Sequence, residues 1–446
     1  MSRNTATLAL ALLLACTAAA QDTLWNWPAP VPWLDATPAV ADFTGDGVLE
    51  VAAPGSTGDV TLLDRAGRVC WRVMLEGPLS MAPTAADVTG GPGAELLVVN
   101  NHGVLYCLDG ASGDVVWQHA LPAGITWGMS CVAARDLDGD GTREIVACDD
   151  GGNVFCLTGA GEQRWRYTGT QGGAKCPAVG TLGGDPSVKV VCSGMSGGVV
   201  CLDRDGTLLW AHPGEAPASS PVLADIDGDG TNEVVVGLDR ALVALDRAGA
   251  VLWRAPLKLE VDSALTATDL DQDGVMELLV VDLAGQLTCV GGDGAVRWTA
   301  DMESHVRRSP TVADIDGDGA LEILVAGYSG ALHVVTPDGY IKYRVPQAGQ
   351  SNASAVVAPL AEDGAPVVLY TTCTGQLDAL RWPQARAGAA MPWPDYRGGP
   401  TRCGAPATPA GNAAQITAFD PGRGHVGGIE ASGCARGANL VPGHHS

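Results

Sequence analysis

Short apolar runs recur along this chain and are separated by tight polar turns rich in glycine and aspartate. In one well-formed copy the apolar runs lie at residues 220–226, 233–237, 241–245 and 250–254. Runs of this length joined by tight turns are typical of β-strands and leave no room for helices. The pattern therefore predicts a unit of four short strands.

The same unit repeats through most of the chain. Its first acidic position, between the first two strands, falls at Asp42, Asp87, Asp136, Thr181, Asp225, Asp269, Asp314 and Pro359. The steps run from 44 to 49 residues, a period that fits one four-stranded propeller blade. The sequence thus predicts an all-β fold, an eight-bladed β-propeller of four-stranded antiparallel blades.

An aromatic residue marks the fourth strand of seven copies: Trp71, Trp117, Trp165, Trp210, Trp253, Trp298 and Tyr343. The eighth copy stops after its third strand, at residues 375–381. Residues 23–27, around Trp25, look like an unattached fourth strand. We expect this N-terminal strand to complete the last blade and close the ring, which removes the exposed edges of an open solenoid, the alternative.

The N-terminus has the features of an export signal. Arg3 is followed by an apolar stretch at residues 7–15 and by small residues at 18–20, which predicts a signal peptide over residues 1–20. Cys16 follows a sequence that loosely resembles a lipoprotein box, so a lipid anchor is an open alternative. We expect an exported protein in the periplasm, outside the cell or on the outer surface.

Composition shifts after the last repeat. We place the propeller at residues 21–384 and a Gly/Ala/Pro-rich, mostly disordered tail at residues 385–446. The chain carries 26 basic and 50 acidic side chains, a net charge of -24, which argues against nucleic acid as a partner. No apolar run after the signal approaches a transmembrane segment in length, and we expect a monomer.

The loops after the first strands carry acids spaced as D-x-D-x-D-G-x-x-E, a pattern that can supply the oxygen ligands of Ca²⁺. The candidate ligands are Asp42, Asp46 and Glu50, with Thr44 at the third position; Asp136, Asp138, Asp140 and Glu144; Asp225, Asp227, Asp229 and Glu233; Asp269, Asp271, Asp273 and Glu277; and Asp314, Asp316, Asp318 and Glu322. A solvated acidic turn is the alternative for one loop, but recurrence at a fixed period favours metal. We predict four or five structural Ca²⁺ ions.

Two family resemblances meet in this chain. The acidic loops resemble VCBS/FG-GAP repeats of the integrin-α type, and residues 103–117 resemble the PQQ-like repeat of bacterial quinoproteins and of an outer-membrane assembly lipoprotein. Residues 393–398 resemble a WPxFRG-like tag of such propellers, although there it tends to lie near the N-terminus. The vicinal cysteine pair that quinoprotein dehydrogenases tend to carry is absent, so no PQQ is expected.

Thirteen cysteines in an exported chain suggest disulfides. Cys107, Cys156, Cys201 and Cys289 occupy one equivalent position of the repeat, however, which a small buried residue explains equally well. Cys192 and Cys201, on either side of a short turn, are the best candidate for a bonded pair.

A ligand is expected at the mouth of the central channel, opposite the acidic loops. Small residues at the start of each first strand are predicted to line the channel: Thr37, Ala82, Cys131, Cys176, Ser220, Ala264, Ser309 and Ser354. The candidate binding residues at the mouth are Trp33, Asp35, Trp127, Lys175, Asp262, Arg307, Arg308 and Asn352. Aromatic and charged groups together suit a glycan or a protein segment.

The sequence therefore indicates an exported, calcium-binding interaction module. Two alternatives remain open. One is a polysaccharide lyase-like enzyme, for which Lys175, Arg307 and Arg308 form the cluster to test; the other is a periplasmic assembly-factor scaffold, which a lipidated Cys16 would favour.

Overall fold

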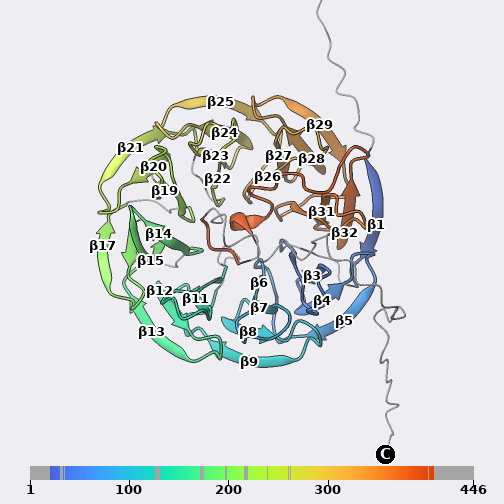
Figure 1. Ribbon diagram of the computed structural model, residues 1–446, viewed down its shortest axis with the longest axis horizontal. Coiled ribbons are helices and arrows are strands. Elements are labelled where there is room, and N and C mark those ends of the chain that lie inside the picture. Colours follow the sequence, from blue (N-terminus) through green and yellow to red (C-terminus); the bar gives the residue numbers. More distant parts are fainter. Residues whose placement is uncertain are drawn as a thin grey trace, which may run out of the picture.

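The protein is an all-β, eight-bladed propeller with almost no helix (Figure 1). The computed structural model describes residues 21–30, 34, 36–125, 131–170, 175–195, 198–214, 219–238, 240–259, 261, 263–399 and 401–405. Each blade is a four-stranded antiparallel sheet, so the predicted architecture is confirmed. Within the described ranges no helix is long and apolar enough to cross a membrane.

The first four blades follow chain order from the centre of the ring to its rim. Blade 1 contains β2 (Ala39–Ala41), β3 (Glu50–Pro54), β4 (Asp59–Leu63) and β5 (Val69–Met74). Blade 2 contains β6 (Thr84–Ala86), β7 (Glu95–Val99), β8 (Val104–Leu108) and β9 (Val115–Ala120). Blade 3 contains β10 (Ala133–Arg135), β11 (Glu144–Cys148), β12 (Asn153–Leu157) and β13 (Gln163–Thr168). Blade 4 contains β14 (Ala178–Leu182), β15 (Asp185–Ser193), β16 (Val199–Leu202) and β17 (Leu208–His212).

The next three blades repeat this order, and the last differs. Blade 5 contains β18 (Val222–Ala224), β19 (Glu233–Leu238), β20 (Ala241–Leu245) and β21 (Val251–Pro256). Blade 6 contains β22 (Thr266–Thr268), β23 (Glu277–Val281), β24 (Gln286–Val290) and β25 (Val296–Asp301). Blade 7 contains β26 (Thr311–Ala313), β27 (Glu322–Ala326), β28 (Ala331–Val335) and β29 (Ile341–Pro346). Blade 8 contains β30 (Val356–Ala358), β31 (Val367–Thr372), β32 (Gln376–Arg381) and, as its outer strand, β1 (Asp22–Pro28).

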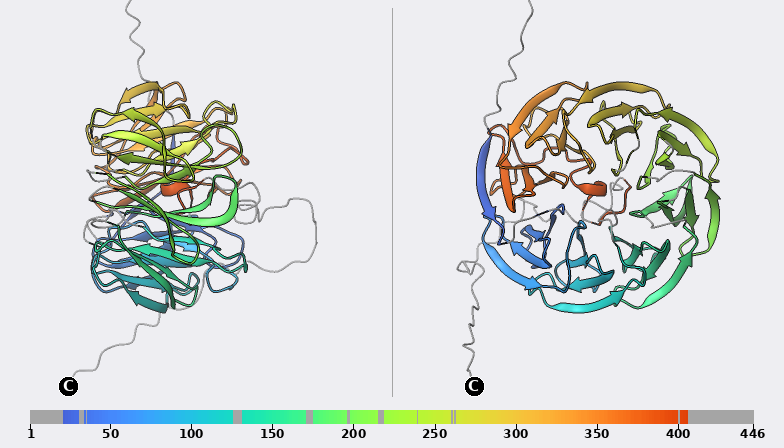
Figure 2. Two further views of the ribbon diagram at one scale, coloured as in Figure 1. Left: turned by 90° about the vertical axis from the view of Figure 1, so that its left-hand side faces the viewer. Right: turned by 180° about the vertical axis from the view of Figure 1, so that it is seen from behind.

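The N-terminal strand closes the ring, as the sequence predicts. β1 pairs antiparallel with β32, and Trp27 lies opposite Leu377. From behind, blue β1 lies on the rim directly outside the orange-red strands of blade 8 (Figure 2). The first and last parts of the chain thus share one sheet, and β1 covers the edge of β32 that would otherwise be exposed.

The burial pattern follows each strand's place in the ring. The second and third strands of blade 1 are buried at every position, whereas the outer strand alternates between half-buried and exposed residues. Inner strands are covered on both faces by neighbouring blades, and such strands take continuous apolar runs. The repeat therefore encodes one apolar layer between each pair of blades.

On six outer strands a tryptophan indole donates a hydrogen bond to a carbonyl of the following blade. The Trp71 indole donates its N–H to the Gly110 carbonyl, at 2.8 Å. Trp25 makes the same bond, also 2.8 Å, to the Arg65 carbonyl of blade 1. Gly67 permits this contact because its φ is 76° and a Cβ there would lie 2.7 Å from the Trp25 ring. The closing seam is therefore built like the others.

The expected pairing of Cys192 with Cys201 is wrong. Cys192 lies opposite Val200, and Cys201 lies opposite Val191, in the register of β15 and β16. Successive side chains of a strand point to opposite faces, so these two thiols lie on opposite faces of blade 4. Neither Cys192 nor Cys201 is in a disulfide.

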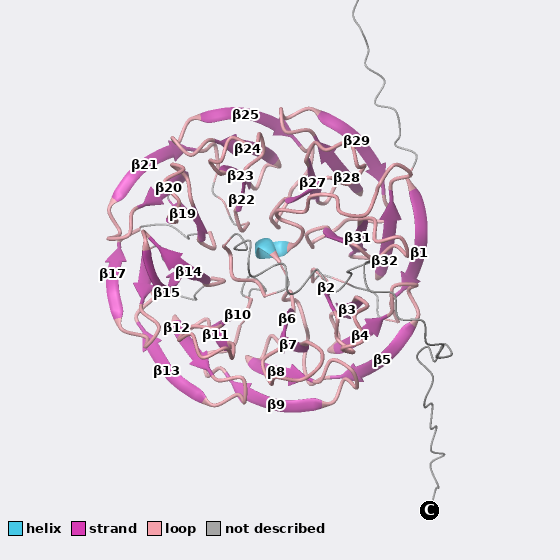
Figure 3. Cartoon of the chain, in the orientation of Figure 1, coloured by secondary structure: helices cyan, strands magenta, loops and turns pink. Residues whose placement is uncertain are grey.

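Part of the segment expected to be disordered is folded. Residues 385–399 and 401–405 run into the centre of the ring, where the short 3-10 helix η1 (Tyr396–Gly398) lies (Figure 3). Trp393 and Arg397 there are fully buried. Residues 406–446 lie outside the described ranges.

Candidate functional site

Five acidic loops connect the first and second strands of blades 1, 3, 5, 6 and 7. In blade 5 the first acid, Asp225, accepts the N–H of Gly228 at 2.8 Å and of Gly230 at 2.8 Å. The last acid, Glu233, accepts the N–H of Ile226. The glycines have φ of 75° and 86°, a conformation that glycine adopts without strain. The sequence thus folds each loop around its own carboxylates.

The loops bring carboxylate oxygens together. In each, three acids have ligand atoms within 4.8 Å of one another. These groups are Asp42, Asp46 and Glu50; Asp136, Asp138 and Glu144; Asp225, Asp227 and Asp229; Asp269, Asp271 and Asp273; and Asp314, Asp316 and Glu322. Three predicted ligands of each loop are therefore close together, whereas Asp140, Glu233, Glu277 and Asp318 are not part of these groups. An all-oxygen set of this kind suits a hard cation such as Ca²⁺.

Ionisation of the last acid is disfavoured in several loops. Burial, together with the charges of Asp46 and Asp42, raises the pKa of Glu50 to about 7, although backbone hydrogen bonds to its carboxylate oppose the rise. Burial likewise raises the pKa of Glu233 to about 7, with Asp227, Asp229 and Asp225 adding to the effect. The pKa of Glu277 is raised for the same reasons. A bound cation would relieve this repulsion.

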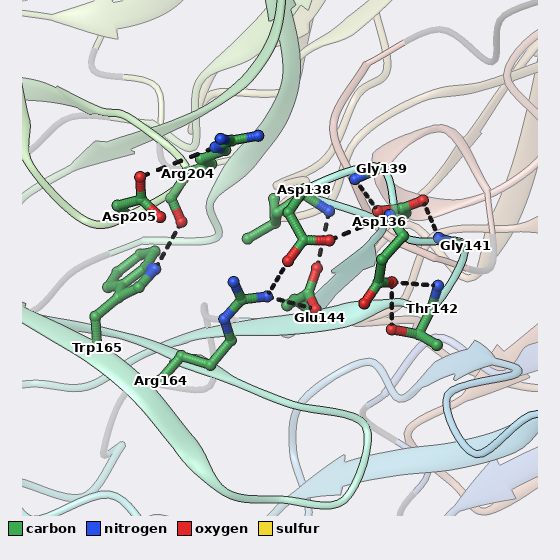
Figure 4. A network of polar contacts seen from close by, with 12 residues as sticks. Asp136, Asp138, Gly139, Gly141, Thr142, Glu144, Arg164, Trp165, Arg204 and Asp205 are labelled. Carbon is green, nitrogen blue, oxygen red and sulfur yellow. Dashed lines mark hydrogen bonds and ion pairs between the residues drawn. The ribbon is translucent and has the colours of Figure 1, made fainter.

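Two loops contain a basic side chain of their own. The Arg164 guanidinium lies 2.8 Å from an Asp138 oxygen and 2.7 Å from a Glu144 oxygen (Figure 4). In blade 7 the Lys342 ammonium lies 2.7 Å from Asp316 and 2.7 Å from Glu322. These cations come from the outer strands β13 and β29, and the acidic pattern of the loops gave no sign of them.

The other three blades depart from the pattern, as the sequence indicates. In blade 2, Asp87 accepts the N–H of Gly90 and Glu95 accepts that of Val88, but no third acid joins them among the described residues. In blade 4, β14 and β15 continue into a tight turn in place of the loop, and Lys189 pairs with Asp185 at 2.7 Å.

Of the eight residues predicted for the channel mouth, the four that the structure describes do not form one open surface. Trp33, Asp35, Trp127 and Asp262 lie outside the described residues. Lys175 and Arg308 are 2% and 8% exposed, Asn352 is half-buried, and Arg307 is exposed beside His305. The Arg308 guanidinium donates to the Asn352 carbonyl at 2.9 Å and lies over the Tyr396 ring. The cluster of three cations thus presents only Arg307 to solvent.

The channel itself is filled by the C-terminal part of the described chain, which we call the channel segment (residues 390–399 and 401–405). All eight predicted lining positions are buried, and Ala82, Cys131, Cys176 and Ala264 pack around Tyr396. The small residues found by sequence therefore surround a side chain of the protein itself.

Backbone hydrogen bonds attach the channel segment to five blades. In each of these blades, one N–H of the innermost strand donates to a carbonyl of the channel segment. The carbonyls of Thr401, Cys403, Gly404, Trp393 and Pro394 accept these N–H groups from Ala134, Val179, Leu223, Val312 and Val357, at 2.8–3.1 Å. The segment thereby accepts hydrogen bonds from backbone N–H groups that, at the inner edge of a sheet, have no neighbouring strand to pair with.

Two buried arginines satisfy the carbonyls that also point to the axis. Arg397 donates to the carbonyls of Pro177 and Pro221, at 2.7 and 2.5 Å. Arg402 donates to the carbonyls of Pro83 and Pro38, at 3.1 and 3.2 Å. These four acceptors occupy equivalent positions, just before the innermost strands of blades 4, 5, 2 and 1. Convergent carbonyl dipoles make the axis a favourable place for a cation.

Arg402 also has a carboxylate partner. Its Nη1 lies 2.5 Å from Asp395 Oδ1, and both side chains are almost fully buried. Burial raises the pKa of Asp395, and the Arg402 charge and hydrogen bond oppose that rise.

The sequence signal that could have revealed this segment is the grouping of Trp393, Tyr396 and two arginines within a stretch of glycine, alanine and proline.

Comparisons with known proteins agree with the PQQ-like resemblance. A family model described as outer membrane protein assembly factor BamB, built on PQQ-like repeats, matches residues 56–220 and 239–382, more than half of the chain. The match ends before the channel segment. A search of the curated proteins finds no match. The VCBS/FG-GAP resemblance stays a prediction.

Several solved propellers share the fold. BamB from Moraxella catarrhalis is 16% identical with a TM-score of 0.58, covering 82% of this chain and 98% of that one. Sqt1 from Saccharomyces cerevisiae is 14% identical with a TM-score of 0.65, covering 82% and 100%. BBS1N, solved in complex with ARL6DN, is 12% identical with a TM-score of 0.54, covering 83% and 99%. At these identities the likeness concerns the fold alone.

Proposed function

Because the chain belongs to the family described as outer membrane protein assembly factor BamB, we propose that it is an exported scaffold that binds protein partners during assembly at the outer membrane. The family match is the observation that carries this proposal. BBS1N, a propeller of similar fold, was solved in complex with a protein, which supports a protein partner over a glycan. A lipid anchor at Cys16 would hold such a scaffold at the membrane.

The partner is proposed to bind outside the channel, because the channel segment fills the axis. Exposed apolar side chains on the outer strands offer contact area: Val115 and Val116 in blade 2, and Leu208 and Leu209 in blade 4, are each 44–50% exposed. Apolar side chains that remain exposed on a folded surface favour protein contacts.

Deleting the gene in its native host tests the assembly role. We expect a loss of folded outer-membrane proteins that the wild-type chain restores, and that a Val116→Asp, Leu209→Asp variant restores less well. Normal levels of folded outer-membrane proteins in the deletion strain would contradict the proposal. If the purified chain instead bound a glycan array and no envelope protein, the glycan alternative would replace it.

Calcium is proposed as a structural ion of the acidic loops. Their all-oxygen donor sets and the raised pKa of Glu50 and Glu233 support this. The ion would supply positive charge between side chains that repel one another. Ligands that bind only the folded state raise its stability by mass action, by about 2.7 kcal/mol per site at a hundredfold excess over Kd.

Chelation tests the calcium proposal. EGTA should lower the melting temperature, and Ca²⁺ should restore it better than Mg²⁺, which favours retained waters over protein cages. A melting temperature that ignores both chelator and added Ca²⁺, with no ion found in dialysed protein, would show that these loops are ordinary acidic turns.

A further inference from the structure

The outer strand of each complete blade carries a bulge at one repeated position. In blade 7, Val334 lies opposite Tyr343 and Val335 lies opposite Ile341, so Lys342 is the extra residue between them. In blade 3, Arg164 is the extra residue in the same way. A bulge turns its residue away from the regular alternation of the strand. This position therefore decides what faces the acidic loop of the same blade.

In blade 7 the bulge residue occupies the centre of the acidic cluster. Lys342 Nζ is within 2.7–3.1 Å of oxygens from Asp316, Asp318 and Glu322. Arg164 in blade 3 contacts Asp138 and Glu144 at 2.7–2.8 Å. In both blades one cationic side chain thus touches two or three of the oxygens that would otherwise ligate an ion.

The bulge residue is different in the other three acidic blades. It is Cys70 in blade 1 and Leu252 in blade 5, and neither can carry a positive charge. In blade 6 it is Arg297, whose ion pair is with Asp293 of the adjacent turn, at 3.1 Å. The described ion pairs therefore place a cation in the loops of blades 3 and 7 only.

We propose that Arg164 and Lys342 are built-in cations that replace calcium in blades 3 and 7, so that calcium binds only in blades 1, 5 and 6. The inference rests on the proposed calcium function. An ammonium and a calcium ion cannot share the same oxygens, and their charges repel strongly at such short range. Calcium could enter blade 7 only by displacing Lys342 from all its partners.

Exchanging the bulge residues tests this proposal. Lys342→Leu frees the blade 7 oxygens that the ammonium contacts. They lie beside Asp316 Oδ1, which is buried and accepts no hydrogen bond among the described residues. Leu252→Lys places an ammonium at the matched position of blade 5, where the leucine is 50% exposed and its loss should not disturb the core. Arg297→Leu is the matched control, because the Arg297 guanidinium pairs with Asp293 of the adjacent turn.

Calcium per chain is measured by equilibrium dialysis followed by elemental analysis, with melting curves in EGTA and in Ca²⁺. We expect three ions in the wild type and in Arg297→Leu, four in Lys342→Leu and two in Leu252→Lys. Lys342→Leu should melt lower than the wild type in EGTA, because Glu322 then has no cation, and should recover in Ca²⁺. If Lys342→Leu fails to fold in EGTA, Arg164→Met provides the same gain of one ion in blade 3.

The outcomes separate this inference from the calcium proposal. Five ions in the wild type, unchanged in Lys342→Leu, would overturn the built-in cations and leave calcium binding intact. No ion in the wild type would overturn calcium binding and this inference together.

Discussion

Replacing Arg402 by methionine would test whether the channel segment holds the ring together. Methionine keeps an unbranched apolar stem of similar length but has no hydrogen-bond donors. The substitution removes the ion pair with Asp395 and the hydrogen bonds to the carbonyls of Pro83, Pro38 and Tyr396. All these groups lie at the axis, away from water.

The expected loss follows from what remains after the change. Breaking a buried ion pair by removing one partner costs about 3–5 kcal/mol, because the other charge stays buried and unpaired. Asp395 can reduce this cost by taking up a proton, since burial already raises its pKa. Three carbonyls also lose donors, at about 1 kcal/mol each. We therefore expect Arg402→Met to lower the free energy of unfolding by about 3–5 kcal/mol.

Urea unfolding followed by tryptophan fluorescence measures this loss. Arg307→Met is the control, because Arg307 is exposed and its guanidinium donates to His305; this variant should stay within about 0.5 kcal/mol of the wild type. Adding Asp395→Asn to Arg402→Met should recover part of the loss, because the unpaired buried carboxylate at the axis is then also removed. A loss below about 1 kcal/mol for Arg402→Met would refute the view that the channel segment stabilises the ring.

Three further predictions concern closure, a seam and pH. Deleting residues 22–27 should open blade 8. Light scattering should then detect aggregation, or melting curves should show a large destabilisation; a monodisperse protein with unchanged melting would contradict closure by β1. Gly67→Ala should cost more than the about 1–2 kcal/mol of left-handed strain, because its Cβ would meet Trp25, whereas Gly90→Ala, with φ 78° and open space, measures the strain alone. In EGTA, stability should fall as the pH rises from about 4.5 to about 7, because folded Glu50 and Glu233 keep protons that the unfolded chain has released; urea midpoints that stay constant over this range would contradict the raised pKa values.

The sequence by itself determined the ring. A fixed period, apolar runs of strand length and an aromatic residue on the fourth strand of seven copies specify a blade, because each strand's burial depends on neighbours that the same repeat supplies. The unattached strand around Trp25 identified the closure, since only the eighth copy lacked an outer strand. The clustering of acids within each loop was also predictable, because those residues are neighbours in sequence.

The contents of the axis were decided only by the tertiary structure. The channel segment has no apolar periodicity, and its order comes from backbone groups of five blades that meet only once the ring has closed. The same holds for Arg164 and Lys342, which lie about twenty residues from the acids they contact and reach them through a bulge. The sequence repeat predicts the strands, because each strand packs against equivalent strands of the same repeat. The contacts of the channel segment, Arg164 and Lys342 follow no repeat, so only the folded chain brings these residues together.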